Sequence, residues 1–438
     1  MPVHSSVDRE DACADAVEHE EVRARCGGAC VCLAVSTVPT PAVDLAARRH
    51  ATHTPPMPRP AFTDGQRHLA RLRLAGQLLG AERAESPAEA VRWMLALQAQ
   101  DFPGVKWSVG LRTAGATERD VETALDAGRL VRSWPMRGTL HLVTARDLPW
   151  MLELTASRSI VSAARRRAVL GITEADIERA RETAIDSLTG GRALARANLL
   201  GAIQAGGVST AGQRGYHLLW YLAQTGTLVM GGTDARGQTY ALLDEWVGDR
   251  LRFERDEALG ELARRYFASH GPATVADLAR WSGLPVRDIR RGLEVAGEAL
   301  TTIEVESVTY NLSPETLGAP VPATGVLLLP GFDEYVLGYR DRSAVLAPEH
   351  NDAIVPGGNG MFKATIVVDG EIVGTWSRRA ISRHVVVEPA LFEEPSPEQD
   401  GLVAAAERYG RFLGRSATVG TRRSVSVTDR DVRSSPNG

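Results

Sequence analysis

The sequence predicts an α+β fold, in which repeated helical units precede a β-rich C-terminal domain. Two observations support this prediction. Between about residues 62 and 315, short helices opened by capping residues are three times followed by a short β-rich segment. From about residue 320, short β-branched runs broken by turn residues take over. Helices followed by a two-stranded wing describe a winged helix, so we expect three tandem winged-helix units and then a barrel-like domain with a terminal helix.

The helix starts are marked by capping residues. Ser86 precedes Pro87, and Glu89 follows at the third helical position. A serine there accepts a hydrogen bond from the N3 amide, and proline is favoured at the first helical position. A looser form of the same box, a threonine followed three residues later by aspartate, recurs at Thr117, Thr173 and Thr274.

The three β-rich segments fit wings. The first reads MRGTLHLV and the second TGTLVMGG, and both contain Gly-Thr-Leu. The third reads TTIEVESVTYNL. They occupy residues 136–143, 225–232 and 301–312. We therefore place the three winged-helix units at residues 62–145, 146–250 and 251–315.

The third unit carries the clearest helix-turn-helix. A first helix runs to Trp281, a turn follows, and Pro285 opens a second helix. One stripe of the second helix is predicted to be buried, and it consists of Val286, Ile289 and Leu293. An adjacent face gathers three arginines, Arg287, Arg290 and Arg291. This face fits phosphate contacts by a recognition helix, and the alternative is a solvated arginine face on a scaffold helix.

The C-terminal domain is expected over residues 320–414, closed by a helix within residues 396–414. Asp369-Gly370, between the runs TIVV and EIVGTW, is a strong hairpin signal. Arg378 and Arg379 follow it. The hairpin could therefore probe the DNA minor groove, or it could be plain barrel structure.

Composition narrows the class of protein. The chain has 438 residues, of which 44% are hydrophobic, and its formal net charge is −4. Overall basicity therefore does not indicate nucleic acid, although only Lys106 and Lys363 among 50 basic residues are lysine, and arginine suits phosphate. All four cysteines lie in the first 32 residues, at spacings that fit no standard zinc pattern. We expect no disulfide framework, no metal, no membrane span and no secretion signal, and hence a cytoplasmic protein.

Both ends of the chain read as disordered. Residues 1–60 mix Ala, Glu, Arg and Pro without a period, and Met57 is an alternative start just before the first periodic helix. Residues 415–438 also lack a pattern.

Two glutamines, Gln98 and Gln100, close an apolar run. Pro103 biases Phe102 away from helical geometry, so the helix begun at Pro87 is predicted to end near Ala99. In an extended exit, alternate residues share one side, and both amides could converge on one small target. An amide offers an acceptor and two donors without net charge, which suits a water or a cationic sugar. The alternative is a helix cap plus a surface amide.

Four motifs occur along the chain in this order: LQAQ, RSWPMRGTLHLV, LLPGFDEYVLGYRDR and NGMFKATIVVDGEIVGTW. In these motifs and their order, the chain resembles the winged-helix DNA-binding family that contains the AlkZ and YcaQ DNA glycosylases. The resemblance covers residues from about 66 to 413. The resemblance implies that Gln98-Ala99-Gln100 matches the Gln-aliphatic-Gln catalytic motif of the AlkZ type. Asp101 is not at the YcaQ spacing, and its role stays open.

The resemblance also implies a chemistry. Family glycosylases remove bulky N7-alkylated purines, including interstrand cross-links, and we expect no cofactor for this chain. The alkylated base is already cationic, so no strong general acid is needed, and an oxocarbenium-like sugar must be stabilised while water attacks. We expect Gln100 to orient the water and Gln98 to hold the sugar or to support that water. The expected partner is duplex DNA that carries alkylated purines. We expect the protein to act as a monomer and to associate with the nucleoid.

The same motifs lead us to expect roles for further side chains. Arg137 and His141 are expected to contact phosphate near the lesion, with a backbone hydrogen bond inside the wing as the alternative for His141. Trp134 is expected in the core. The Asp333, Tyr335, Tyr339 and Arg342 side chains are expected to lock the C-terminal domain to the helices. The competing function is a winged-helix regulator that binds DNA without cutting the glycosidic bond.

Overall fold

The computed structural model describes residues 62–234, 237–319, 325–393 and 399–420. The four cysteines, Met57 and residues 421–438 lie outside the described residues, and so do the expectations that concern them. Within the described ranges, no helix is both long and apolar enough to cross a bilayer.

The first group of helices opens with a capping box on Thr63, and Ser86 and Thr117 cap helices as predicted, each accepting from the N3 amide. A hairpin follows, whose turn lies at Arg137-Gly138. The elements are α2 (Asp64–Gly76), α3 (Pro87–Met94), β1 (Ala96–Gln98), α4 (Phe102–Arg112), α5 (Glu118–Asp126), β2 (Leu130–Met136) and β3 (Thr139–Thr144).

The second group repeats the plan with more helices, and its hairpin joins the first hairpin in one sheet. The six strands run in the order β1-β3-β2-β5-β6-β4, with Arg132 of β2 opposite Met230 of β5. The elements are α6 (Leu148–Ser162), α7 (Ala164–Val169), α8 (Glu174–Leu188), β4 (Leu194–Ala195), α9 (Arg196–Ala205), α10 (Arg214–Gln224), β5 (Leu228–Asp234), β6 (Gly237–Leu242) and α11 (Leu243–Trp246).

The third group contains the predicted helix-turn-helix. Gly283 ends the first helix in the left-handed conformation with a φ of 74°. One member of the predicted buried stripe is wrong: the Val286 side chain is 41% exposed, because Ile289 and Gly292 face the core instead. The elements are α12 (Arg255–His270), α13 (Val275–Ser282), α14 (Val286–Ala296), η1 (Gly297–Ala299), β7 (Thr301–Val305) and β8 (Val308–Leu312).

The C-terminal region holds a five-stranded sheet in the order β13-β12-β11-β10-β9, against which α18 packs. Among the described residues, β13 and β9 are the two edge strands of this sheet and do not pair with each other. The sheet is therefore open there, and the expected barrel is not confirmed. Residues 416–419 form β13, parallel to β12, which corrects the expectation of disorder there. The elements are α15 (Pro314–Gly318), β9 (Val326–Leu329), α16 (Glu334–Leu337), η2 (Pro348–His350), α17 (Asn351–Ile354), η3 (Pro356–Gly358), β10 (Thr365–Val368), β11 (Glu371–Ile381), β12 (His384–Leu391), α18 (Gln399–Phe412) and β13 (Ser416–Val419).

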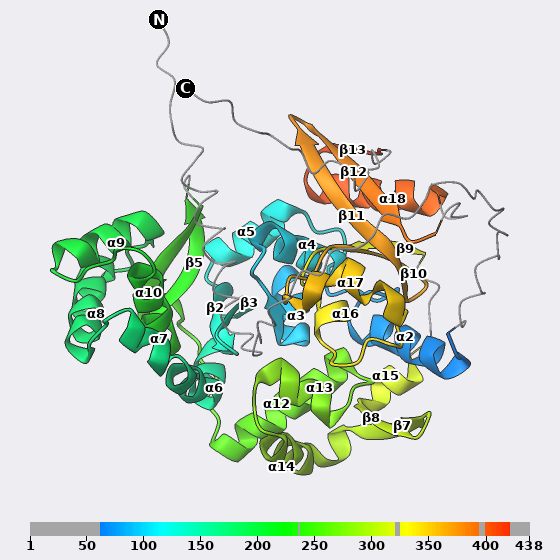
Figure 1. Cartoon of the computed structure of the whole chain (residues 1–438), viewed down its shortest axis with the longest axis horizontal. Helices are drawn as coiled ribbons and strands as arrows, with labels where there is room; N and C mark the ends of the chain where they lie inside the picture. The colour runs from blue at the N-terminus through cyan, green and yellow to red at the C-terminus, as the bar shows by residue number, and fades with distance from the viewer. Residues whose placement is uncertain (1–61, 235–236, 320–324, 394–398, 421–438) are drawn as a thin grey trace, which may run out of the picture.

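The Asp369-Gly370 turn is a hairpin as predicted, with φ values of 47° and 99°. It lies against α2: a Cβ added at Gly370 would come within 3.0 Å of Ala70, and Tyr335 Oη donates to the Gly370 carbonyl at 2.7 Å. Gly370 is therefore buried, although Asp369 is exposed, and these contacts favour the alternative of a purely structural turn over one that probes the minor groove. The exposed end of the sheet is the β11–β12 connection, which projects from the molecule (Figure 1).

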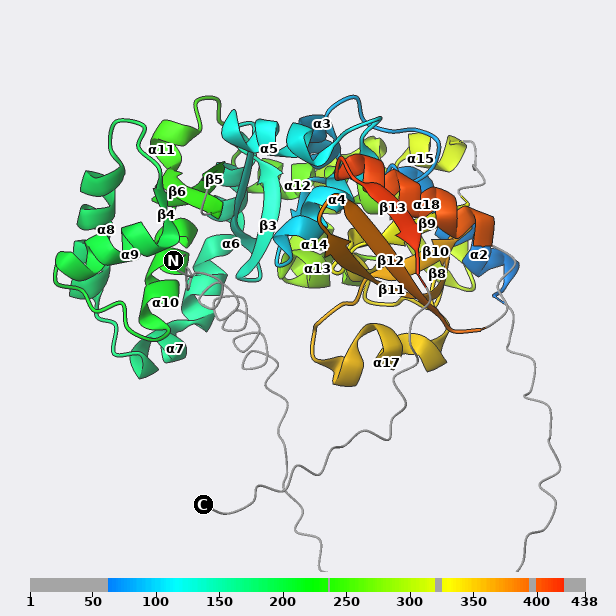
Figure 2. The ribbon, with the colours of Figure 1, turned by 90° about the horizontal axis from the view of Figure 1, so that it is seen from above.

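The groups share their cores. Around the first group lie the second group at one side, α12–α14 at another and the C-terminal sheet with α18 at a third (Figures 1 and 2). One apolar cluster includes Trp134 of β2, Trp220 of α10 and Trp376 of β11. The other includes Trp150 of α6 and Trp281 of α13. Trp134 is thus a core residue, as predicted. The first group lies at the centre of the molecule, with the other groups packed around it.

Candidate active site

Gln98 is the last residue of a short strand, and Gln100 lies two residues beyond it. Helix α3 ends at Met94, five residues before the predicted end, because Leu95 takes a φ of 65° and reverses the chain. Strand β1 then pairs antiparallel with β3, which sets Gln98 opposite His141. The expectation that Phe102 is not helical is wrong, because Phe102 is the first residue of α4. Pro103 lies in the first turn of this helix, where a missing N–H is tolerated. The extended exit that the sequence allowed is therefore a short edge strand.

Both glutamines are fixed by their side-chain carbonyl oxygens. Gln98 is 8% exposed, and its Oε1 accepts from Arg137 at 3.3 Å. Gln100 is half-buried, and its Oε1 accepts from the Leu140 backbone N–H at 2.9 Å. Both partners are pure donors, so they determine which end of each amide is oxygen. These bonds to one hairpin argue against the interpretation as a helix cap and a surface amide.

Arg137 lies in the β2–β3 turn with a φ of 53°. It donates to Gln98, and its Nη2 lies 3.4 Å from His141 Nε2. Burial, aided by the nearby Arg280, lowers the pKa of Arg137 to about 10, so it remains a cation at neutral pH. Gly283 makes room for it, since a Cβ there would lie 3.1 Å from Arg137 Cγ. The turn of the helix-turn-helix thus borders the glutamine site.

His141 does not contact phosphate, contrary to the first expectation. It is fully buried, and its Nδ1 lies 2.9 Å from the Thr139 carbonyl. Burial and the neighbouring Arg137 lower its pKa to about 4. The ring is neutral at physiological pH, so Nδ1 donates to Thr139 and Nε2 accepts from Arg137. The structure shows the backbone hydrogen bond that was the alternative role, within the hairpin of β2 and β3.

This buried imidazole predicts a pH dependence of stability. The unfolded chain binds a proton at His141 below about pH 6.5, whereas the folded chain does so only near pH 4. The pKa of His141 is lower in the folded chain than in the unfolded chain. The contribution of this group to the free energy of unfolding is therefore fully present above pH 6.5 and is lost as the pH falls toward 4. We expect the free energy of unfolding to fall by about 1.4 kcal/mol per pH unit between pH 6 and 4.5 from this group. Urea denaturation across that range measures it.

The matched variant is His141→Gln, which cannot titrate. Its free energy of unfolding should be lower at pH 7 but should vary less between pH 6 and 4.5. An equal slope in both proteins would assign the pH dependence to other groups.

Glu334 is a site residue that sequence reasoning missed. It is fully buried on α16, where Oε1 accepts from the Gln98 backbone N–H at 2.9 Å and Oε2 from Trp281 Nε1 at 2.9 Å. His270 Nε2 lies 3.6 Å from Oε2. Burial alone would raise the pKa of Glu334, but His270, His141 and Trp281 outweigh it and the pKa is lowered. An acidic residue inside the apolar DEYVL motif was the available signal.

The other predicted DNA-binding arginines lie apart from this site. Arg291 is engaged by Asp256 at 2.6 Å and by Glu294 at 3.1 Å. On the same helix, Arg287 and Arg290 are exposed. On β11, Arg378 donates to Tyr409 Oη at 2.6 Å, and Arg379 lies 3.3 Å from Glu388. In the described part of the chain, none of these five arginines is bonded to either glutamine.

Comparison with known proteins identifies the family. The family described as DNA glycosylase AlkZ-like matches residues 91–412, which is more than half of the chain. The chain belongs to the AlkZ-like DNA glycosylase family. The matched range begins in α3, ends at the last residue of α18 and includes both glutamines, Arg137 and Glu334. The family predicted from the four motifs is therefore confirmed.

A relative and a solved structure extend the likeness over most of the AlkZ-like chain. An interstrand DNA cross-link repair glycosylase of Streptomyces sahachiroi is 27% identical over 368 residues, which are 81% of this chain and 96% of the relative. The structure of Streptomyces sahachiroi DNA glycosylase AlkZ matches with a TM-score of 0.68 at 27% identity and covers 81% of this chain and 99% of that one. The predicted α+β class agrees with this match.

Proposed function

We propose that this AlkZ-like chain is a monofunctional DNA glycosylase that hydrolyses the N-glycosidic bond of N7-alkylated purines and unhooks interstrand cross-links in base excision repair. The observation that carries the proposal is the pair of amides at the end of β1 and just beyond it, whose oxygens are held by the donors Arg137 and Leu140. The name of the Streptomyces sahachiroi relative supports cross-links as substrates.

The chemistry needs little acid catalysis. N7 alkylation makes the base a cationic leaving group, so the barrier lies in forming an oxocarbenium-like sugar and delivering water to C1′. Neutral His141 and buried Glu334 are not acids at this site. A carbonyl oxygen has two lone pairs, so each glutamine can accept one more hydrogen bond while its NH2 group donates. Gln100 then orients the water, and Gln98 holds the sugar.

Around the glutamines, we infer that the three helix-and-hairpin groups are winged helices that bind duplex DNA as a monomer. Arg137 is the phosphate contact nearest to the lesion, since it remains cationic beside Gln98. Exposed Arg287 and Arg290, together with Arg378 and Arg379 on β11, reach phosphates farther away. Arg291 contributes less, because Asp256 and Glu294 already neutralise it.

The test is incubation of the protein with a duplex that carries one N7-alkylguanine, followed by alkali. A glycosylase leaves an abasic site, and alkali then cleaves the strand. The competing regulator would retard a DNA fragment on a gel and leave every strand intact. Release of the base with no strand cleavage before alkali supports a monofunctional enzyme, and cleavage without alkali would refute it.

Glu334 gives a second prediction, because its carboxylate positions the Gln98 backbone without touching substrate. Glu334→Gln replaces a charged acceptor by a neutral amide between two donors. Hydrogen bonds to charged groups contribute about 1.5–3 kcal/mol, so we expect at least a tenfold lower single-turnover excision rate. DNA affinity should stay close to that of the unmodified protein. Equal losses in rate and affinity would indicate a general structural defect instead.

A further inference from the structure

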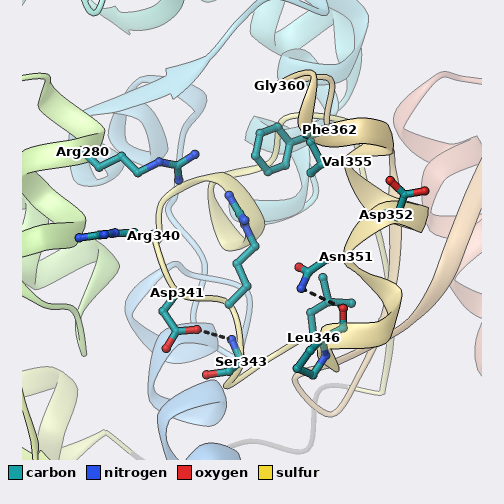
Figure 3. A pocket seen from close by; sticks show the side chains of 13 residues that line it. Arg280, Arg340, Asp341, Ser343, Leu346, Asn351, Asp352, Val355, Gly360 and Phe362 are labelled. Carbon is teal, nitrogen blue, oxygen red and sulfur yellow. Dashed lines mark hydrogen bonds between the residues drawn. The ribbon is translucent and has the colours of Figure 1, made fainter. Parts of the chain in front are cut away.

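A second polar site is lined in part by helix α13, whose following residue Gly283 adjoins Arg137. A pocket of about 600 Å³ opens between α13 and the segment that follows α16, and Figure 3 shows the side chains that line it. Three arginines contribute to it: Arg280 from α13, and Arg340 and Arg342 from the segment. None of the three was singled out as a DNA contact by the sequence.

Two of these arginines, Arg280 and Arg342, are held by neutral groups, and the Arg340 side chain is exposed. Arg280 Nη1 donates to the Tyr339 carbonyl at 2.9 Å, and Arg342 Nε donates to the Val336 carbonyl at 2.9 Å. The Arg342 guanidinium lies over the Phe362 ring, 4.9 Å from its centroid. Among the described residues, no ion pair joins any of the three to a carboxylate. Arg280 and Arg342 are thus oriented without a direct ion pair to a carboxylate.

Two aspartates also line the pocket, and both accept from backbone. Asp341 Oδ1 accepts from the Ser343 N–H at 2.9 Å, and Asp352 Oδ1 accepts from the Gly357 N–H at 2.7 Å. They shape the loop rather than pair with the arginines. Burial and the neighbouring Arg280 lower the pKa of Arg342 to about 10, and the carboxylates of Asp341 and Asp277 offset this only in part.

The chemistry that suits this arrangement is an anion with several oxygens. Guanidinium groups present donors in a planar fork that matches phosphate, and they are less strongly hydrated than ammonium groups. Arg342 is half-buried, so its side chain is ordered before any ligand arrives. A solvated surface cluster would lack both the carbonyl anchors and the stacking on Phe362.

The position of the pocket identifies the source of the anion. Arg280 lies close enough to Arg137 and to Arg342 to affect the titration of each. Gly283, at the end of the same helix α13, adjoins Arg137. Helix α13 therefore borders the glutamine site on one side and the pocket on the other. A DNA strand that offers its sugar to Gln98 would pass the pocket.

We propose that Arg280, Arg340 and Arg342 bind a phosphodiester group of duplex DNA, on the strand whose damaged nucleotide faces Gln98 and Gln100. The inference rests on the proposed glycosylase function for the assignment of that strand. The phosphate contact fixes the register of the duplex over the glutamines.

The experiment compares three full-length variants. Arg340→Gln and Arg342→Gln each remove one pocket charge, and Arg119→Gln removes an equal charge from an exposed position on α5, on the opposite side of the molecule in Figure 2. Affinity for undamaged duplex is measured by fluorescence anisotropy at several salt concentrations. Each pocket variant should bind about tenfold more weakly and show a salt slope smaller by about one, and Arg119→Gln should match the unmodified protein.

Circular dichroism and the binding of inorganic phosphate are measured as well. Circular dichroism confirms folding, and exposed Arg340 provides a variant that does not disturb the stacking on Phe362. Unchanged affinity and slope in both pocket variants would overturn the phosphate site, even if the unmodified protein excises the lesion. Micromolar binding of inorganic phosphate that Arg340→Gln abolishes would assign the pocket to free phosphate and overturn the DNA assignment. Loss of affinity in a protein that excises nothing would leave the phosphate site standing and refute the glycosylase.

Discussion

Replacement of Gln98 or Gln100 by alanine should lower the single-turnover rate of N7-alkylguanine excision by about 10²–10³-fold for each residue. Preorganised dipoles aimed at charge that develops in the transition state contribute about 2.7–4 kcal/mol per group. Each amide here is preorganised, because Arg137 and Leu140 hold its oxygen. The measurement is base release under enzyme excess from a duplex with one defined lesion.

The two glutamine variants should differ in their side effects. Gln98→Ala leaves Arg137 without its amide partner, so we expect some loss of DNA affinity as well as rate. Gln100→Ala leaves the Leu140 N–H without its acceptor, which costs about 1 kcal/mol of stability. Gln204→Ala, an exposed glutamine on α9, is the matched control and should behave like the unmodified protein. Excision within a factor of two in both folded variants would refute the catalytic assignment.

Local features of the fold could be predicted because their causes are local. Each capping box needs only a threonine or serine and the residue three positions on, so the helix starts at Thr117, Thr173 and Thr274 appear as expected. The Asp369-Gly370 turn likewise follows from two residues that tolerate positive φ. The end of α3 was predicted wrongly, since nothing in the sequence indicates that Leu95 adopts a φ of 65°.

The parts that sequence reasoning missed depend on distant residues. Glu334 reaches the Gln98 backbone across 236 positions, and the arginine pocket joins α13 to residues about sixty positions later. The joining of two hairpins into one sheet rests on the pairing of Arg132 with Met230. His141 was misassigned for a related reason. Its spacing from Arg137 was correct, but only the pairing of β3 with β1 shows that its ring is covered.

Loss of the ion pair between Arg112 and Asp333 should have the largest effect on stability. Both side chains are fully buried, and Arg112 Nη1 and Nη2 each donate to one Asp333 oxygen at 2.9 Å. Ser108 Oγ donates to Asp333 Oδ2 at 2.6 Å, and Gln77 Oε1 accepts from Arg112 at 2.8 Å. Asp333→Ala leaves a buried guanidinium without its counter-charge, and such a loss costs about 3–5 kcal/mol. Guanidinium chloride denaturation at pH 7 measures the free energy of unfolding.

The paired variant separates the charge from the packing. Arg112→Met combined with Asp333→Leu removes both charges, and we expect it to be more stable than either Asp333→Ala or Arg112→Ala. Hydrogen bonds and the Arg112 cation keep the pKa of Asp333 low in spite of burial, so the stability this pair contributes is present above about pH 4 and is lost below it. A cost below about 1 kcal/mol for Asp333→Ala at pH 7 would show that the guanidinium finds another partner.

The same ion pair connects stability to the site. Arg112 lies at the end of α4, the helix that follows the glutamines, and Asp333 directly precedes Glu334, whose carboxylate holds the Gln98 N–H. A change that loosens Asp333 therefore also loosens the support of β1. We expect Asp333→Ala to lose excision activity at temperatures below its own unfolding transition, whereas the double variant, with this buried charge removed, should retain more activity. Activity that declines only with global unfolding in both would show that the ion pair stabilises the fold without positioning Gln98.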